Sequence, residues 1–114
     1  GEKVAQWGES HMGNEYSYVG AVVGATYPEM GKVLRKIMPK AYILVPGYGA
    51  QGAAGRDLAG CFDPNGGGAV VNASRSLLCA HQKRPELGWL EATRAEAVRM
   101  REDITAGFRK GADE

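Results

Sequence analysis

Three short runs of apolar residues divide the sequence, and each is followed by a loop and a helical pattern. The runs are YVGAVVG at 18–24, YILV at 42–45 and AVVN at 69–72. Short apolar runs that are rich in β-branched residues and lack alternation predict strands buried on both faces. Strands of this kind, joined by helices, predict a parallel sheet in an α/β fold.

Helical patterns occupy the segments around these strands. One ends at Gly8, a second starts at Pro28, a third lies near 56–62, and a long one runs from about Glu86 to Arg109. This order fits either a small doubly wound sheet or part of a (β/α)8 barrel. The expected core-facing residues of the second and last helices are Val33, Leu34, Ile37, Met38, Leu87, Leu90, Ala97, Val98, Ile104 and Phe108.

The net charge and the cysteine content argue against several classes of protein function. The formal net charge is +1, so the sequence predicts neither nucleic-acid binding nor attachment to a membrane surface. No apolar run approaches the roughly 18 residues that span a bilayer. Cys61 and Cys79 stand alone, which favours a reducing, cytoplasmic setting and no metal site.

The loops after the three strands carry the residues best suited to chemistry. In both candidate architectures, ligands bind at the carboxyl ends of the strands. Gly47 and Gly49 would let the backbone approach an anion closely, and Gln51 adds an amide. Arg75 follows the third strand near the start of a short helical turn, where its guanidinium and free backbone N–H groups could grip a phosphate. The residues therefore predict a phosphate pocket.

A second interpretation of the same glycines is a dinucleotide fingerprint. Gly47-x-Gly49-x-x-Gly52 follows a strand and precedes a helix, and Arg75 could accommodate the 2′-phosphate of NADP. Pro46 at the strand end and the strand–helix unit before it weaken this interpretation. From the residues alone, a phosphate-binding barrel and an NADP-binding fold both remain open.

Three segments in register resemble one enzyme family. VGAVVGATYPE at 19–29, LVPGYGAQG at 44–52 and VVNASRSLL at 70–78 are similar to the last strands and loops of orotidine 5′-monophosphate decarboxylases of the longer bacterial and protozoan branch. The resemblance implies a cofactor-free (β/α)8 barrel that converts orotidine 5′-monophosphate to uridine 5′-monophosphate and CO₂. Residues 1–114 would be one segment of that barrel domain, about strands 6 to 8, with the N-terminal part outside this chain.

The resemblance also implies roles for individual residues. Gln51, Ser74 and Arg75 would bind the substrate phosphate, with Ser74 contributing its backbone N–H. The pyrimidine pocket would be lined by Val23, Thr26, Pro46 and Gly47. The implied partners are the nucleotide monophosphate, the N-terminal part of the same barrel and a second copy in a homodimer.

The family's catalytic cluster is missing from these residues. The resemblance implies an Asp-x-Lys-x-x-Asp motif on an earlier strand, whose lysine protonates the carbon that loses CO₂. That motif does not occur in the 114 residues. We therefore expect the segment to hold no catalytic residue and to be inactive alone.

Overall fold

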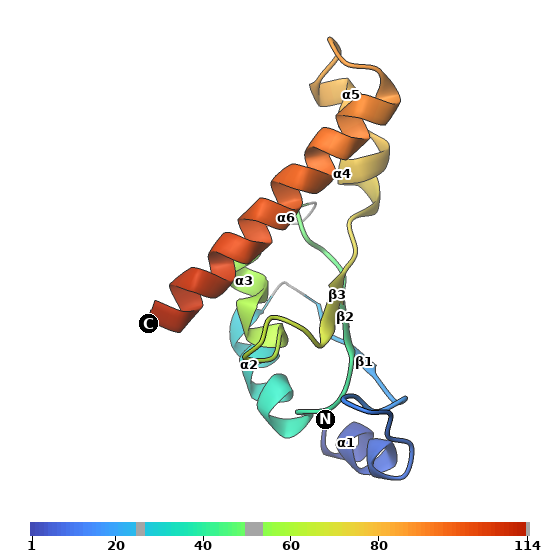
Figure 1. The fold of residues 1–114 in the computed structure, drawn as a ribbon, viewed down its shortest axis with the longest axis vertical. Coiled ribbons are helices and arrows are strands. Elements are labelled where there is room, and N and C mark those ends of the chain that lie inside the picture. The colour runs from blue at the N-terminus through green and yellow to red at the C-terminus, as the bar shows by residue number, and fades with distance from the viewer. Residues whose placement is uncertain (25–26, 50–53, 114) are drawn as a thin grey trace.

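The computed structural model describes residues 1–24, 27–49 and 54–113, with side chains described as far as Phe108. Its elements alternate much as the sequence predicts (Figure 1). They are α1 (Glu2–Glu9), β1 (Ala21–Val22), α2 (Pro28–Ile37), β2 (Ile43–Val45), α3 (Gly55–Leu58), the 3-10 helix η1 (Ala59–Cys61), β3 (Ala69–Val71), α4 (Ser74–Leu78), α5 (Ala80–Lys83) and α6 (Trp89–Asp113).

The strands form one parallel sheet in the order β1-β2-β3, which confirms the parallel arrangement predicted from the sequence. Ala21 pairs with Ile43, and Ile43 pairs in turn with Ala69. The first strand is much shorter than the run 18–24, because the central strand that it pairs with offers only three residues.

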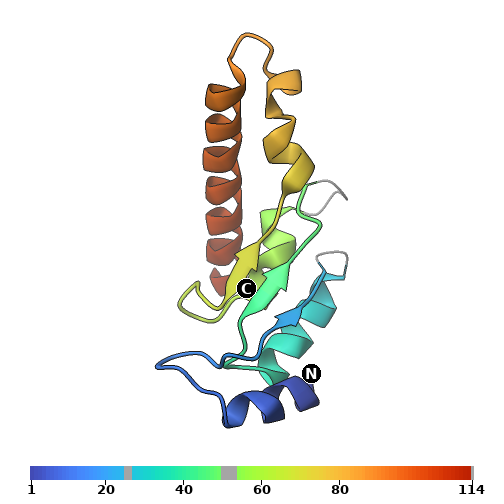
Figure 2. The same ribbon diagram turned by 90° about the vertical axis from the view of Figure 1, so that its right-hand side faces the viewer.

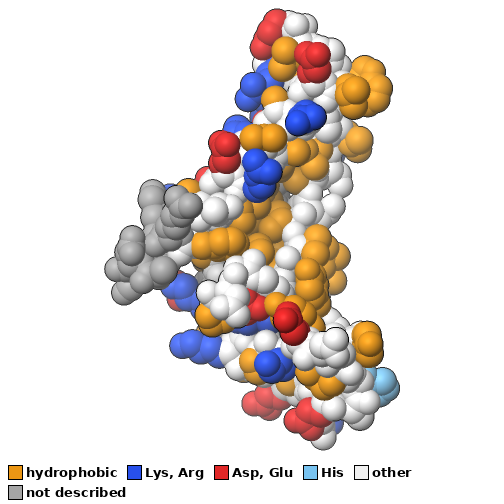
Figure 3. Space-filling view, viewed as in Figure 1, with side chains coloured by type: hydrophobic (Ala, Val, Ile, Leu, Met, Phe, Trp, Pro, Cys, Tyr) orange, Lys and Arg blue, Asp and Glu red, His pale blue; other side chains and the backbone are white. Residues whose placement is uncertain are grey.

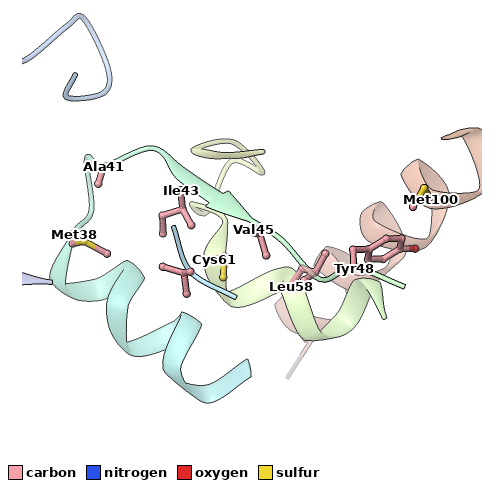
Figure 4. Close-up of a cluster of buried hydrophobic side chains, with 9 residues drawn as sticks. Met38, Ala41, Ile43, Val45, Tyr48, Leu58, Cys61 and Met100 are labelled. Atoms are coloured by element: carbon pink, nitrogen blue, oxygen red, sulfur yellow. The ribbon is translucent and has the colours of Figure 1, made fainter. Parts of the chain in front are cut away.

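Helices cover one face of this sheet. In β2, Ile43 and Val45 are fully buried, whereas Leu44 between them is 43% exposed. Figure 2 shows the strands in front, with α2, α3 and α6 behind them. The core between the layers contains Val23, Met38, Ala41, Ile43, Val45, Tyr48, Leu58, Cys61 and Met100, most of them labelled in Figure 4.

The other face of the sheet is open, so within these residues the expected burial on both faces is seen on one face only. Val22, Leu44 and Val70 are 67%, 43% and 50% exposed, and they line a shallow hollow with Tyr42. Figure 3 shows hydrophobic side chains gathered where the strands lie. A doubly wound sheet carries helices on both faces, whereas a barrel carries its helices outside and packs side chains within. The one-sided cover therefore favours the barrel.

The open face leads us to expect that the isolated chain associates. Contiguous apolar surface favours contact with other chains, and so do the outer edges of β1 and β3, which pair with no further strand among the described residues. In sedimentation velocity, residues 1–114 should form oligomers or aggregates, and heating should give a broad transition. A Leu44→Glu variant should associate less, because it places a charge at the centre of the face. A clean monomer that unfolds cooperatively would contradict this expectation.

The last helix starts later than expected. It begins at Trp89, not Glu86, because 84–87 form a turn in which the N–H of Leu87 donates to the carbonyl of Arg84. Its buried stripe also differs from the expected one: Ala92 and Met100 are buried, while Leu90 is 66% exposed.

Arg35 of α2 joins the elements at the amino ends of the strands. Its side chain is 8% exposed, and its guanidinium donates to the carbonyls of Cys61 (2.8 Å), Met38 (3.1 Å), Ala41 (2.9 Å) and Gly68 (2.7 Å). Burial lowers the pKa of Arg35, and the nearby Asp63 carboxylate opposes that shift. Arg35 therefore ties α2 and η1 to the segments that enter β2 and β3.

A tyrosine–aspartate pair lies close to Arg35. The hydroxyl of Tyr16 donates to Oδ2 of Asp63 at 2.5 Å, and Oδ1 accepts the N–H groups of Asn65 and Gly67. The hydrogen bond from Tyr16 is the main cause that lowers the pKa of Asp63. These contacts fix the turn that leads into β3, at the end of the sheet opposite the predicted ligand loops.

Candidate functional site

The segments expected to bind ligand share the carboxyl edge of the sheet. Val23 continues β1, with its N–H donating to the carbonyl of Leu44 at 2.9 Å. Asn72 continues β3, with its N–H donating to the carbonyl of Val45 at 3.0 Å. Pro46 follows β2 directly, so the ends of the three parallel strands bring these loops to one side of the molecule.

Two glycines shape the turn after β2. Gly47 and Gly49 have φ angles of 92° and 78°, in the left-handed region that glycine adopts without strain. A Cβ on Gly49 would lie 3.2 Å from the hydroxyl oxygen of Ser76 on α4. The turn after β2 therefore passes directly beside the helix that carries Ser74 and Arg75.

Helix α4 presents the predicted cation. Ser74 and Arg75 form its first turn, and both are exposed. The hydroxyl of Thr93 on α6 lies 3.0 Å from the carbonyl oxygen of Leu77, which joins the far end of α4 to α6. The long helix thus supports the short one, and the guanidinium of Arg75 remains accessible.

The remaining predicted residues differ in their surroundings. Pro46 and Gly47 are half-buried at the strand edge. The side chain of Val23 is 6% exposed and belongs to the core between sheet and helices. Thr26 and Gln51 lie outside the described residues, so the structure gives no view of their side chains.

Sequence reasoning missed the group that supports this edge. Tyr48 is 2% exposed, and its hydroxyl donates to Oδ2 of Asp103 on α6 at 2.5 Å. The same carboxylate oxygen accepts the N–H of Gly55 at 2.9 Å. Burial, followed by the hydrogen bond to Asp103, raises the pKa of Tyr48 to about 12, so the phenol keeps its proton at neutral pH. In the sequence, Tyr48 and Asp103 are 55 residues apart, and no local pattern links them.

The start of α3 does not suit a dinucleotide. In that fold the pyrophosphate sits on free N–H groups at the start of the helix after the fingerprint. Here the N–H of Ala54 donates to Asp57 at 2.9 Å, and that of Gly55 donates to Asp103. The helix is also only four residues long. These features, with the one-sided sheet, argue against the NADP-binding interpretation.

Among the residues that the structure describes, no group of three or more His, Cys, Asp or Glu side chains could hold a metal ion. Within the same residues, no helix is both long enough and apolar enough to cross a bilayer.

Known proteins similar to this chain are orotidine 5′-phosphate decarboxylases. The enzyme of Rhodopirellula baltica is 47% identical over 95 residues, which cover 78% of this chain and 32% of that protein. The enzyme of Clostridium kluyveri is 42% identical over 107 residues, which cover 91% of this chain and 36% of that protein. The chain thus spans about a third of the length of the curated relatives it matches. No protein-family model matches it.

Solved structures lead to the same group. A protein of Toxoplasma gondii described as an orotidine-monophosphate decarboxylase superposes with a TM-score of 0.64 and 26% identity, covering 95% of this chain and 40% of that one. The UMP synthase of Leishmania donovani gives a TM-score of 0.51 and 33% identity, covering 68% of this chain and 17% of that one. The expected fold, part of a (β/α)8 barrel, is confirmed.

Proposed function

Because this chain belongs to the orotidine 5′-phosphate decarboxylase family, we propose that it forms the phosphate-binding side of a decarboxylase active site. The substrate would be orotidine 5′-monophosphate, and the products uridine 5′-monophosphate and CO₂. The chain would supply about strands 6 to 8 of the barrel as one segment. The remaining strands would come from a part outside these residues.

The observation that carries this proposal is the contact between two motif-bearing segments. The turn at Gly47 and Gly49 lies beside Ser76. Ser76 directly follows Arg75, which is exposed. A guanidinium binds phosphate through paired, charge-assisted hydrogen bonds. We assign the phosphate to Arg75, the N–H of Ser74 and the amide of Gln51.

The pyrimidine is assigned to the adjoining strand ends. Pro46 and Gly47 would lie against the ring, and the residues that follow β1, from Val23 to Thr26, would line the pocket. Because the side chain of Val23 packs in the core, the backbone there is the part proposed to face the ring. The acid–base groups of the reaction would come from the rest of the barrel, so the segment alone is expected to be inactive.

The same proposal includes a cellular location and an oligomeric state. A cytoplasmic location is supported by Cys61 and Cys79, which are both free thiols. A homodimer is supported by the family resemblance. No cofactor is required by the proposed reaction.

Calorimetry on the complete barrel tests the proposed ligand. Uridine 5′-monophosphate should bind, and uridine should bind much more weakly, because Arg75 and its N–H neighbours would then lack their anion. NADP should give no heat of binding. The three titrations use one preparation, so a folding defect would affect all of them equally. Tight NADP binding without a response to uridine 5′-monophosphate would defeat the decarboxylase proposal.

A further inference from the structure

The open face of the sheet changes character at its carboxyl edge. Val22, Leu44 and Val70 pair in register across the three strands and form an apolar row on this face. Successive side chains of a strand point to opposite faces, so the next row on the same face lies two residues further along each strand. This row, here called the end row, consists of Gly24, Pro46 and Asn72.

Backbone pairing continues from the sheet into the end row. Val45 and Val71 are the last paired residues of β2 and β3, and the next N–H, that of Asn72, donates to the carbonyl of Val45 at 3.0 Å. Asn72 is exposed and Pro46 is half-buried. Asn72 therefore lies next to Pro46 on the open face, at the edge where β3 leads into α4 (Figure 2).

Asn72 provides the hydrogen-bonding side chain of the end row. Gly24 has no side chain, and Pro46 has an apolar ring without an N–H. The carboxamide of Asn72 offers two donor hydrogens and an acceptor oxygen, and no side-chain hydrogen bond or ion pair with another described residue engages it. A Cβ on Gly24 would meet no described atom within 4 Å, so space is open beside the row.

An amide at this position needs a polar partner in the complete barrel. The inner positions of such barrels are filled mainly by branched apolar side chains, as at Val22, Leu44 and Val70. An amide that is buried without a hydrogen bond destabilises the fold. Because ligands bind at the carboxyl ends of barrel strands, the substrate is the polar group best placed to meet Asn72.

We propose that Asn72 is a further substrate-binding residue, whose carboxamide donates a hydrogen bond to a carbonyl oxygen of the pyrimidine ring. This role rests on the proposed function and deepens it. Pro46, the neighbour of Asn72 in the end row, is assigned a contact with the ring, and Arg75, three residues further on, is assigned the phosphate. A neutral amide matches a neutral ring carbonyl without burying a charge.

Asn72→Leu in the complete barrel tests this contact, because leucine is similar in size and lacks the amide. Its Kd for uridine 5′-monophosphate, measured by calorimetry, should rise about fivefold, as loss of one neutral hydrogen bond implies. Ribose 5-phosphate keeps the sugar and the phosphate but has no ring. Its Kd, measured by competition with uridine 5′-monophosphate, should not change. Arg75→Ala should instead weaken both ligands, since both carry the phosphate.

Two further variants control for bulk and for location. Asn72→Ala removes the amide without adding bulk and should reproduce the result of Asn72→Leu. If leucine alone weakened binding, it would be blocking the pocket, and the proposed hydrogen bond would be wrong. Asn65→Leu makes the same change at an exposed asparagine in the turn that leads into β3, at the opposite end of the sheet, and should leave both Kd values unchanged.

The outcomes separate this role from the function on which it rests. If the wild-type barrel binds uridine 5′-monophosphate and both Asn72 variants bind it equally well, or weaken both ligands to the same degree, the ring contact is wrong and the proposed function stands. A lower melting temperature with unchanged Kd values would assign Asn72 to packing against another strand. If the wild-type barrel neither decarboxylates orotidine 5′-monophosphate nor binds uridine 5′-monophosphate, both fail.

Discussion

Replacing Arg75 with alanine in the complete barrel should lower kcat/KM for orotidine 5′-monophosphate by about 2–4 kcal/mol of transition-state stabilisation, because a paired contact with the anion is lost and each charge-assisted hydrogen bond contributes about 1.5–3 kcal/mol. That corresponds to roughly 30- to 1000-fold. The phosphate lies away from the reacting carbon, and binding energy from such remote groups supports the reaction there. Both kcat and KM should therefore change. Steady-state kinetics at limiting substrate measures the effect.

Two further variants serve as comparisons for this measurement. Gln51→Ala should cost less than Arg75→Ala, because it removes a neutral amide instead of a charge. Arg101→Ala removes an exposed arginine of α6 and should leave kcat/KM unchanged. Equal activity of Arg75→Ala and wild type at limiting substrate would refute the assignment of the phosphate.

The sequence predicted the order of the elements because its signals are local. Apolar runs marked the strands, and Pro28 marked the first residue of α2. Strand lengths were less predictable, since a strand extends only where its neighbour offers partners. The run 18–24 faces a central strand of three residues, and β1 is correspondingly short.

The buried faces of the helices were predicted less well. Val33 belongs to the apolar stripe expected for α2, yet it is 51% exposed. The charged Arg35 is buried in its place, because backbone carbonyls from several elements converge on its guanidinium. That convergence exists only in the folded chain, and no helical periodicity predicts it. The long helix likewise buries Ala92 while Leu90 is exposed.

The candidate site also contains residues that local sequence signals suggest and a contact that the sequence does not suggest. Gly47 and Arg75 could be proposed from the sequence because turn glycines and a cation after a strand are local signals. The contact of Tyr48 with Asp103 joins residues from distant parts of the sequence, so only the structure could reveal it. Without the family resemblance, the residues left the choice between barrel and dinucleotide fold open, because that choice depends on which faces of the sheet the helices cover.

Arg35→Met should destabilise the complete barrel by on the order of 4 kcal/mol, because four carbonyls lose a donor and a buried carbonyl left without any donor costs about 1–3 kcal/mol. The carbonyls of Met38 and Gly68 still accept the N–H groups of Ala41 and Ile43, so the loss falls mainly on the carbonyls of Cys61 and Ala41. Methionine fills part of the volume, so the loss reflects hydrogen bonds more than packing. Urea denaturation and thermal melting measure the change. Arg35→Lys should recover part of it, since an ammonium can still donate to some of these carbonyls.

Lys36→Met on the same helix is the matched control, because it removes an exposed charge and should change stability little. Arg35 lies at the amino ends of the strands, the end of a barrel that serves stability, whereas active sites form at the other end. The folded fraction of Arg35→Met should therefore retain a KM close to that of wild type. If Arg35→Met were as stable as Lys36→Met, the four contacts would contribute no net stability. A large rise in KM at full folding would instead connect the two ends of the sheet, contrary to the separation argued for this fold.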